Sequence, residues 1–253
     1  MRTPTRSFVI AFSLAALGAS AGAGEAGHAP HWTYHGAEGP AHWGELAPEF
    51  ATCKAGREQS PVDIVAGAPS AQSALGFAYT PQALQITNNG HTIQVDRAQG
   101  GTLSVGDARY ALAQFHFHGP SEHTVTGKHY PLELHLVHKA SDGTLAVVGV
   151  LIEQGAANPA LAPIVAHLPN KEGQSASVAA VAFDAATLLP AQHAYAHYRG
   201  SLTTPPCSEG VQWFVLDAPI TASKAQIEAL SRVMGANDRP VQPLNERAIE
   251  FSK

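Results

Sequence analysis

The segment QFHFHGPSEH occupies residues 114–123 and combines a strand pattern with a run of histidines. Apolar and polar residues alternate from 113 to 118, which is the two-residue period of a β-strand with one polar face. Phe115 and Phe117 then face the core. The opposite face carries Gln114, His116 and His118. Two imidazoles two residues apart on a strand can share a metal ion, although such pairs also occur on ordinary solvated faces.

A second alternating segment, LELHLVH at 132–138, places His135 on the same face as Glu133 and Val137. If the two strands are neighbours, His135 becomes a third nitrogen ligand beside the first two histidines. Three histidines and one open position are typical of catalytic zinc, whereas structural zinc is usually closed by four protein ligands rich in cysteine. The pattern therefore predicts a catalytic zinc site.

Two polar residues support this interpretation. Gln114 and Glu133 each lie two residues before a proposed ligand and on the same strand face. There they can accept the hydrogen bond of the ligand's second ring nitrogen and fix its tautomer.

The N-terminus has the pattern of a secretory signal peptide. A basic start is followed by an uncharged apolar run at 7–17 and by Ala19-Ser20-Ala21, an A-x-A cleavage pattern. We interpret residues 1–21 as a cleaved signal, the alternative being an uncleaved amphipathic N-terminus. The protein is then expected in the periplasm or secreted.

Charge and length limit the function classes. The chain has 15 Lys+Arg and 20 Asp+Glu, and its formal charge of −5 becomes −7 once Arg2 and Arg6 leave with the signal. An acidic surface argues against nucleic acid or anionic membranes as partners, and no other apolar stretch approaches transmembrane length. No linker divides the remainder, so residues 22–253 are expected to form one domain.

The two cysteines, Cys53 and Cys207, suggest a disulfide in an exported protein, although two buried free thiols remain an alternative. Histidines also gather near the mature N-terminus, together with three aromatic residues. They could form a weak accessory metal site, but a solvated segment anchored by its aromatics explains them more simply. These residues are His28, His31, His35, His42, Trp32, Tyr34 and Trp43.

The rest of the chain predicts a mainly β protein. Short strands are expected at 77–79, 84–87, 92–95 and 102–105, and a buried strand at 145–152. Their close spacing favours antiparallel pairing. Helices are few: Asn158-Pro159 predicts the start of one that leads to His167, and a capping box at 223–226 with Gly235 predicts another.

Several motifs resemble the α-class carbonic anhydrases, and the first three of them have the order and spacing of that family. They are QFHFHGPSEH at 114–123, ELHLVH at 133–138, SLTTPPCSEGVQW at 201–213, QSPVDI at 59–64, NNGH at 88–91, LAVVGV at 145–150 and NDRPVQPLN at 237–245. The resemblance runs from about His31 to the C-terminus. It implies a single domain built on a large, twisted, mostly antiparallel sheet of about ten strands with a few short helices.

The resemblance also assigns residues. His116, His118 and His135 would bind Zn²⁺, supported by Gln114, Glu133 and the backbone carbonyl of Asn237. Thr203 would accept a hydrogen bond from zinc-bound hydroxide and donate its proton to an ionised Glu122. His91 would be the proton shuttle, because an imidazole titrates near neutral pH.

Other carried-over roles concern the cavity. The residues expected to hold ordered water are Tyr34, Asn89 and Gln94. The apolar pocket for carbon dioxide would be lined by Val137, Val147, Leu202, Thr204, Val211 and Trp213. Cys53 and Cys207 occupy positions that are disulfide-linked in many bacterial members. His123 and His138 are expected to be buried structural residues, and His129 a surface residue.

The implied activity is the reversible hydration of carbon dioxide to bicarbonate and a proton, with secondary esterase activity and inhibition by sulfonamides. Bacterial members are often dimers, so a homodimer is an expectation of the resemblance. One departure from the family pattern is the segment 138–144, which is shorter than in the animal enzymes. It leaves open which inhibitors the cavity rim would select.

Two alternatives belong to other classes. A cupin oxygenase with iron or manganese would use His116, His118 and Glu122. However, this sequence lacks the flanking glycines expected of that fold, and the cupin interpretation leaves Thr203, Gln114 and Glu133 without a role. The other is a zinc-binding protein that keeps the scaffold without turnover. A metal assay and carbon dioxide hydration measurements separate these possibilities.

Overall fold

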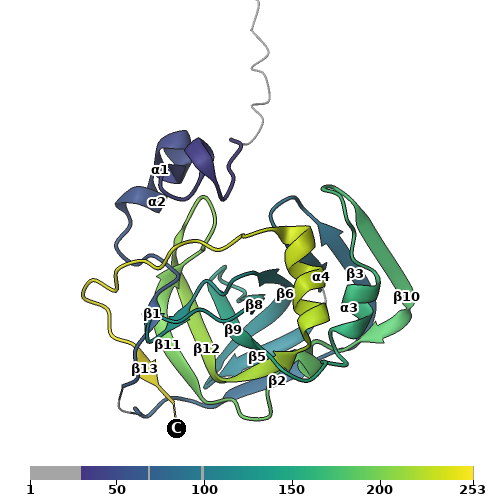
Figure 1. Ribbon diagram of the computed structural model, residues 1–253. Coiled ribbons are helices and arrows are strands. Elements are labelled where there is room, and N and C mark those ends of the chain that lie inside the picture. The colour runs from purple at the N-terminus through teal and green to yellow at the C-terminus, as the bar shows by residue number, and fades with distance from the viewer. Residues whose placement is uncertain (1–29, 68, 98–99, 253) are drawn as a thin grey trace, which may run out of the picture. The chain divides into compact units, whose positions relative to one another are not determined.

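The computed structural model describes residues 30–67, 69–97 and 100–252. The predicted signal peptide and His28 lie outside these residues. The described part is mainly β, as predicted (Figure 1). Within it, no helix combines the length and the apolar character needed to span a bilayer.

The strands have the following bounds: β1 Asp63–Ile64, β2 Leu75–Tyr79, β3 Gln82–Asn88, β4 Ile93–Asp96, β5 Gly101–Val105, β6 Ala108–His118, β7 Thr124–Val125, β8 Leu132–Lys139, β9 Leu145–Gln154, β10 Ser175–Phe183, β11 Tyr195–Ser201, β12 Glu209–Ala222 and β13 Glu250–Phe251. The helices are η1 Gly36–Glu38, α1 Trp43–Leu46, η2 Pro48–Phe50, α2 Thr52–Ala55, α3 Ala162–Ala166, η3 Ala185–Leu188 and α4 Lys224–Met234.

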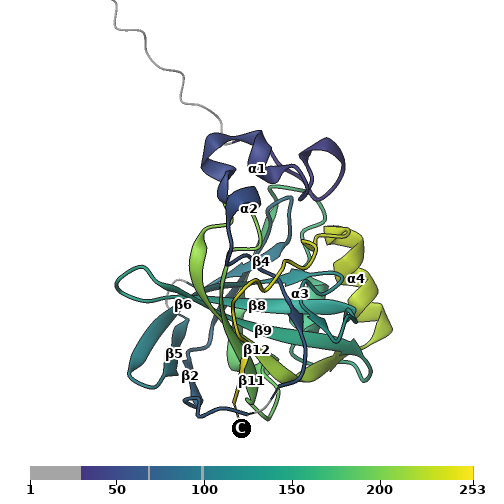
Figure 2. The same cartoon turned by 90° about the vertical axis from the view of Figure 1, so that its left-hand side faces the viewer.

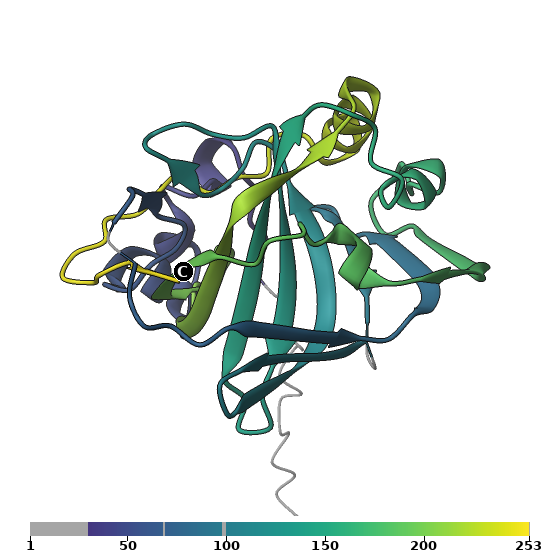
Figure 3. The same ribbon diagram turned by 90° about the horizontal axis from the view of Figure 1, so that it is seen from below.

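Among the described residues, eleven strands form one sheet whose main path runs β10-β3-β4-β6-β8-β9-β12-β11-β13, with β5 paired to β6 and β2 paired to β5. The pairing is antiparallel throughout except between β9 and β12, which are parallel. Figure 2 shows the central strands β6, β8, β9 and β12 side by side, and Figure 3 shows how strongly the sheet twists. β1 and β7 form a separate two-stranded parallel ladder.

Strand alternation sorts side chains between two apolar clusters. Phe115 and Phe117 on β6 enter one cluster with Leu134 and Leu136 on β8. The residues that alternate with these along β6 and β8 point to the opposite face of the sheet, where a second apolar cluster surrounds Trp213. The proposed metal ligands lie on this opposite face, so the same alternation builds the core and the site.

One helix prediction is confirmed and one is partly wrong. Ser223 and Gln226 form the predicted capping box of α4, and Gly235 ends this helix with a φ of 70°. The earlier helix, α3, begins at Ala162 rather than directly after Asn158. The Asn158 side chain instead accepts a hydrogen bond from Ala160 N–H in a turn, and its backbone is hydrogen-bonded to the Gln226 side chain. Asn158 therefore does not cap α3.

Candidate metal centre and active site

Three histidines meet at the centre of the sheet. His116 on β6 and His135 on β8 are directly opposite partners in the antiparallel register, and His118 follows two residues further along β6. The ring centroids of His118 and His135 are 4.5 Å apart. One ring nitrogen from each histidine lies within 4.8 Å of the other two, which is the spacing of a shared metal site.

Each histidine is held through its other ring nitrogen. His116 Nδ1 lies 2.8 Å from Gln114 Oε1, and His135 Nε2 lies 2.9 Å from Glu133 Oε1. The backbone carbonyl of Asn237 accepts from His118 Nδ1 at 2.8 Å. These contacts leave Nε2 of His116, Nε2 of His118 and Nδ1 of His135 for a metal.

The donor set fits zinc. Burial is the main cause that lowers the pKa of all three imidazoles, and for His116 repulsion from His118 and His135 lowers it further. The rings are therefore neutral at physiological pH, as metal coordination requires. Among the described residues, His118 Nε2 is buried without any hydrogen-bond partner, a costly arrangement that a metal would relieve.

Glu122 and Thr203 lie beside this centre. Glu122 is fully buried, and its Oε2 lies 3.8 Å from His135 Nδ1. Burial raises the pKa of Glu122 to about 7, while His135, the Thr203 hydroxyl and the backbone N–H of Arg239 act to lower it. Arg239 N–H donates to Oε1 at 2.9 Å, whereas the described residues offer Oε2 no hydrogen bond that meets the same geometry.

An apolar wall adjoins the metal centre. Val137, Val147 and Trp213 lie in one row across β8, β9 and β12. This row is next to the one that contains His135. Leu202 and Val211 belong to the same apolar cluster, so five of the six predicted pocket residues gather here. The sixth, Thr204, instead lines the polar cavity.

The polar cavity has a volume of about 130 Å³ and contains His116 and His118 in its wall. The predicted water-holding residues Tyr34, Asn89 and Gln94 all line it, as does His91. Asn89 Oδ1 accepts from the backbone N–H groups of His91 and Thr92, and Gln94 Nε2 donates to Asp96. The His91 ring stacks on Trp32 with centroids 3.7 Å apart.

Asn237 links the segments that carry His91 and His118, two of the residues that line this cavity. Besides its carbonyl contact with His118, its side-chain Nδ2 donates to the carbonyls of His91 and Phe117. Its Oδ1 accepts from Gly119 N–H. One residue thus ties the His91 turn to the end of the strand that carries two proposed ligands.

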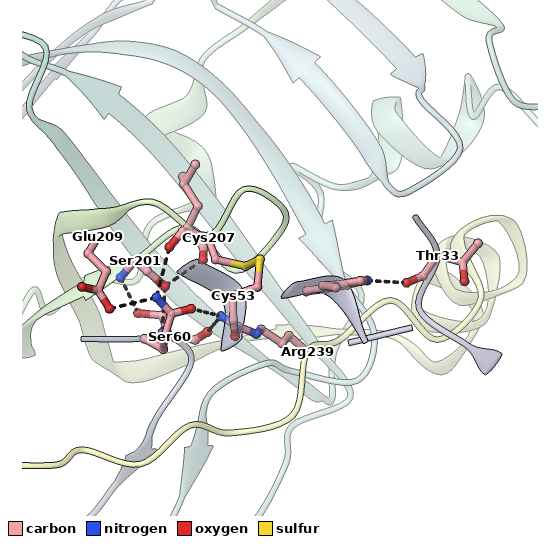
Figure 4. The surroundings of a disulfide bond; sticks show 10 residues. Thr33, Cys53, Ser60, Ser201, Cys207, Glu209 and Arg239 are labelled. Carbon is pink, nitrogen blue, oxygen red and sulfur yellow. Dashed lines mark hydrogen bonds between the residues drawn. A yellow bond between two sulfur atoms is a disulfide. The ribbon is translucent and has the colours of Figure 1, made fainter. Parts of the chain in front are cut away.

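The disulfide between Cys53 and Cys207 is present and links residues 154 positions apart (Figure 4). Cys207 N–H donates to Thr204 O, so the bridge anchors the loop that carries Thr203. Arg239 supports the segment that carries Cys53 (Figure 4). Its guanidinium donates to the carbonyls of Cys53 and Ser60 and to Gln59 Oε1.

His123 and His138 are both fully buried, as predicted. His123 Nδ1 lies 2.8 Å from Glu133 Oε1, and its Nε2 lies 2.6 Å from the Tyr198 hydroxyl. His123, Glu133 and His135 also have spacing that a metal could use. However, Glu133 Oε1 already accepts hydrogen bonds from His123 Nδ1 and His135 Nε2. This group therefore supports the first site. The exposed His129 is a surface residue.

The described histidines of the N-terminal segment, His31, His35 and His42, are not among the metal-compatible groups of the described residues. Tyr34 and Trp32 pack on Trp43 edge to face, in agreement with a segment anchored by its aromatics.

Sequence reasoning assigned no role to Arg239 and none to the contact of Trp32 with His91. Arg239 follows Asn237 in a segment without regular secondary structure, and its partners lie more than 110 positions away. The sequence signal for Arg239 is its place in the NDRPVQPLN motif at 237–245.

Comparison with known proteins decides the family. Residues 38–253 match the family model described as eukaryotic-type carbonic anhydrase. The chain belongs to this carbonic anhydrase family. A carbonic anhydrase from Pectobacterium atrosepticum is 45% identical over 240 residues, covering 94% of this chain and 98% of that protein. A carbonic anhydrase from Nostoc is 47% identical, covering 87% of this chain and 85% of that protein.

The structural comparison agrees. The α-carbonic anhydrase of Thermovibrio ammonificans, solved with the inhibitor sulfanilamide, is 44% identical with a TM-score of 0.86, covering 88% of this chain and all of that chain. Family membership, fold and enzyme class are therefore those expected from the sequence motifs.

Proposed function

We propose that this carbonic anhydrase catalyses the zinc-dependent, reversible hydration of carbon dioxide to bicarbonate and a proton. The observation that carries the proposal is the convergence of His116, His118 and His135, each with its second nitrogen held and its first nitrogen free. Three neutral donors with one open position are the arrangement of a catalytic zinc site.

When bound, zinc supplies Lewis-acid activation that lowers the pKa of water to about 7, an effect for which carbonic anhydrase itself is the standard illustration. The part of this chain is to preserve that effect. Its ligands are uncharged imidazoles, and anionic ligands would neutralise more of the metal's positive charge. Gln114, Glu133 and Asn237 keep the imidazoles oriented, which limits the reorganisation needed during turnover.

We assign to Thr203 and Glu122 the role of orienting the attacking water. Thr203 accepts the hydrogen bond of the nucleophile only if its own proton is engaged elsewhere, and Glu122 is the adjacent acceptor. A cation at the three imidazoles would favour the ionised form of Glu122, because opposite charge lowers a carboxyl pKa. Arg239 N–H holds the other carboxylate oxygen in place.

The apolar wall is assigned to the substrate. Carbon dioxide is small and has no net dipole, so a surface of Val147, Val211 and Trp213 can hold it without competing for the metal. The wall also excludes water from the face on which attack occurs.

The polar cavity is assigned to proton export. His91 lies at the rim and shares the 130 Å³ cavity with two of the proposed ligands, so a short chain of water molecules could connect them. Tyr34, Asn89 and Gln94 offer polar atoms to such waters. An imidazole can accept and release the proton near neutral pH.

We also propose a location for the protein and a secondary activity. A disulfide between Cys53 and Cys207 supports a periplasmic or secreted location, because disulfides persist in oxidising compartments. The same activated water would hydrolyse small esters, and a homodimer remains an expectation from bacterial relatives.

The test is stopped-flow carbon dioxide hydration on protein of measured zinc content, with and without a sulfonamide. We expect activity proportional to zinc content and lost on sulfonamide binding. Zinc-replete protein no faster than buffer would favour the zinc-binding alternative, and iron at stoichiometry without zinc would favour the cupin.

A further inference from the structure

Glu172 lies against the turn that presents His91. Gly90, immediately before His91, has a φ of +85°, and a Cβ built on it would lie 2.7 Å from both Cδ and Oε1 of Glu172. The absence of a side chain at Gly90 therefore gives the carboxylate of Glu172 room to approach the backbone beside His91.

This approach is fixed by the backbone. Glu172 belongs to the connection between α3 and β10, and its neighbours bind the His91 turn directly. Gly173 N–H donates to Asn88 O at 2.8 Å, and Asn88 N–H donates to Gln174 O at 3.0 Å. The Asn88 side chain adds a bond to Pro169 O. The connection cannot shift away from the turn without breaking these bonds.

His91 has few neighbours that could stabilise a positive charge. Its ring is stacked flat on Trp32 and borders a groove of about 250 Å³. The titratable groups that face it are Glu172 from the α3–β10 connection and His31 and Tyr34 from the N-terminal segment, and His35 lines the same groove. Among these, Glu172 is the carboxylate.

The charges act in opposite directions. Partial burial is the main cause that lowers the pKa of His91, Glu172 raises it, and His31 lowers it. Both Glu172 and His31 are exposed, so salt should screen their effects.

We propose that Glu172 is a positioning residue for proton export, whose carboxylate stabilises the protonated imidazole of His91 at the cavity rim. The kinetic part of this inference rests on the proposed function. The electrostatic part does not, since it concerns the protonation of one imidazole.

The first test is an NMR titration of the His91 ring in the zinc-loaded protein. Glu172→Gln should lower the titration midpoint and reduce the ratio of protonated to neutral His91 at a fixed pH by roughly two- to fivefold, as expected for an exposed charge pair. His31→Asn should move the midpoint in the opposite direction. Glu246→Gln, which removes an exposed carboxylate elsewhere, should leave it unchanged.

Salt and kinetics provide the second test. Raising the salt concentration should bring the wild-type midpoint towards that of Glu172→Gln, and Glu172→Asp should restore part of the difference. The pH profile of kcat in weak buffer should shift to lower pH in Glu172→Gln, while kcat/KM stays unchanged, because only proton export is affected.

The outcomes separate the two proposals. An unchanged His91 titration in Glu172→Gln, or a shift equal to that of Glu246→Gln, would overturn the role of Glu172 whatever the activity. A shifted titration in a protein that does not hydrate carbon dioxide would support the electrostatic role and count against the proposed function.

Discussion

Glu133 Oε1 lies 2.9 Å from Nε2 of the proposed ligand His135, and both side chains are buried. The same oxygen lies 2.8 Å from His123 Nδ1, so the carboxylate is fixed from two sides. This arrangement places the proton of His135 on Nε2 and leaves Nδ1 towards the other two imidazoles.

Glu133→Gln should therefore weaken zinc binding. The amide cannot accept from both imidazoles with the same strength, and loss of such a supporting group typically costs 10- to 100-fold in metal affinity. Competition with a chromogenic chelator measures this. Glu153→Gln, an exposed carboxylate on the neighbouring β9, is the matched control. Equal zinc affinity in the Glu133 variant and wild type would show that the carboxylate does not support the ligand.

His91→Ala should slow turnover in weak buffer by at least about tenfold, since general acid–base groups typically contribute 10²–10⁴-fold. Added imidazole should restore the rate, because only proton export is impaired. His167→Ala, at an exposed position after α3, should behave as wild type. A His91 variant with the wild-type rate at low buffer concentration would refute the shuttle assignment.

Removing the disulfide should destabilise the fold. The bridge closes a loop of 154 residues, for which the chain-entropy model gives about 5 kcal/mol of stabilisation. Urea unfolding of the Cys53→Ser/Cys207→Ser variant should show a loss approaching this value, and reduction of the wild-type protein should give the same loss. A difference of less than about 1 kcal/mol would mean that the bridge contributes little beyond the surrounding hydrogen bonds.

His138 should make the fold sensitive to acid. Burial lowers its pKa from 6.5 to about 4, and its Nε2 lies 2.7 Å from the Tyr79 hydroxyl. Between these pH values the unfolded chain binds a proton at this position that the folded chain does not bind. Stability is therefore lost as pH falls from 6.5 to 4, by up to about 3 kcal/mol.

The measurement is urea unfolding of zinc-free protein at several pH values, compared with His138→Gln. The glutamine keeps a hydrogen-bonding group but does not titrate, so its stability should fall less over this range. The buried histidines of the metal centre are common to both proteins and cancel in the comparison. Parallel pH dependences would contradict the assignment.

The sequence predicted the fold and the ligand geometry because both depend on short-range alternation. The two-residue period of 114–118 determines which side chains leave the core, and the pairing of β6 with β8 then brings His135 opposite His116. The family motifs added Thr203, Glu122 and His91. Glu122 lies beside the metal centre, and His91 lines the cavity that contains His116 and His118 in its wall. The roles of all three residues stay predictions.

The parts that could not be predicted depend on contacts across long sequence separations. The hydrogen bonds of Arg239 with Glu122 and Cys53 span 117 and 186 positions. The helix expected after Asn158 starts later because Gln226, 68 positions away, binds that residue. Local patterns carry no information about such partners.

The most direct test of the metal centre is anomalous diffraction from crystals of the zinc-loaded protein, collected on both sides of the zinc edge. We predict one strong peak, about 2.0–2.1 Å from His116 Nε2, His118 Nε2 and His135 Nδ1, with no fourth protein ligand. A peak at another set of residues, or a protein atom in the fourth position, would contradict a catalytic zinc site held by these three imidazoles.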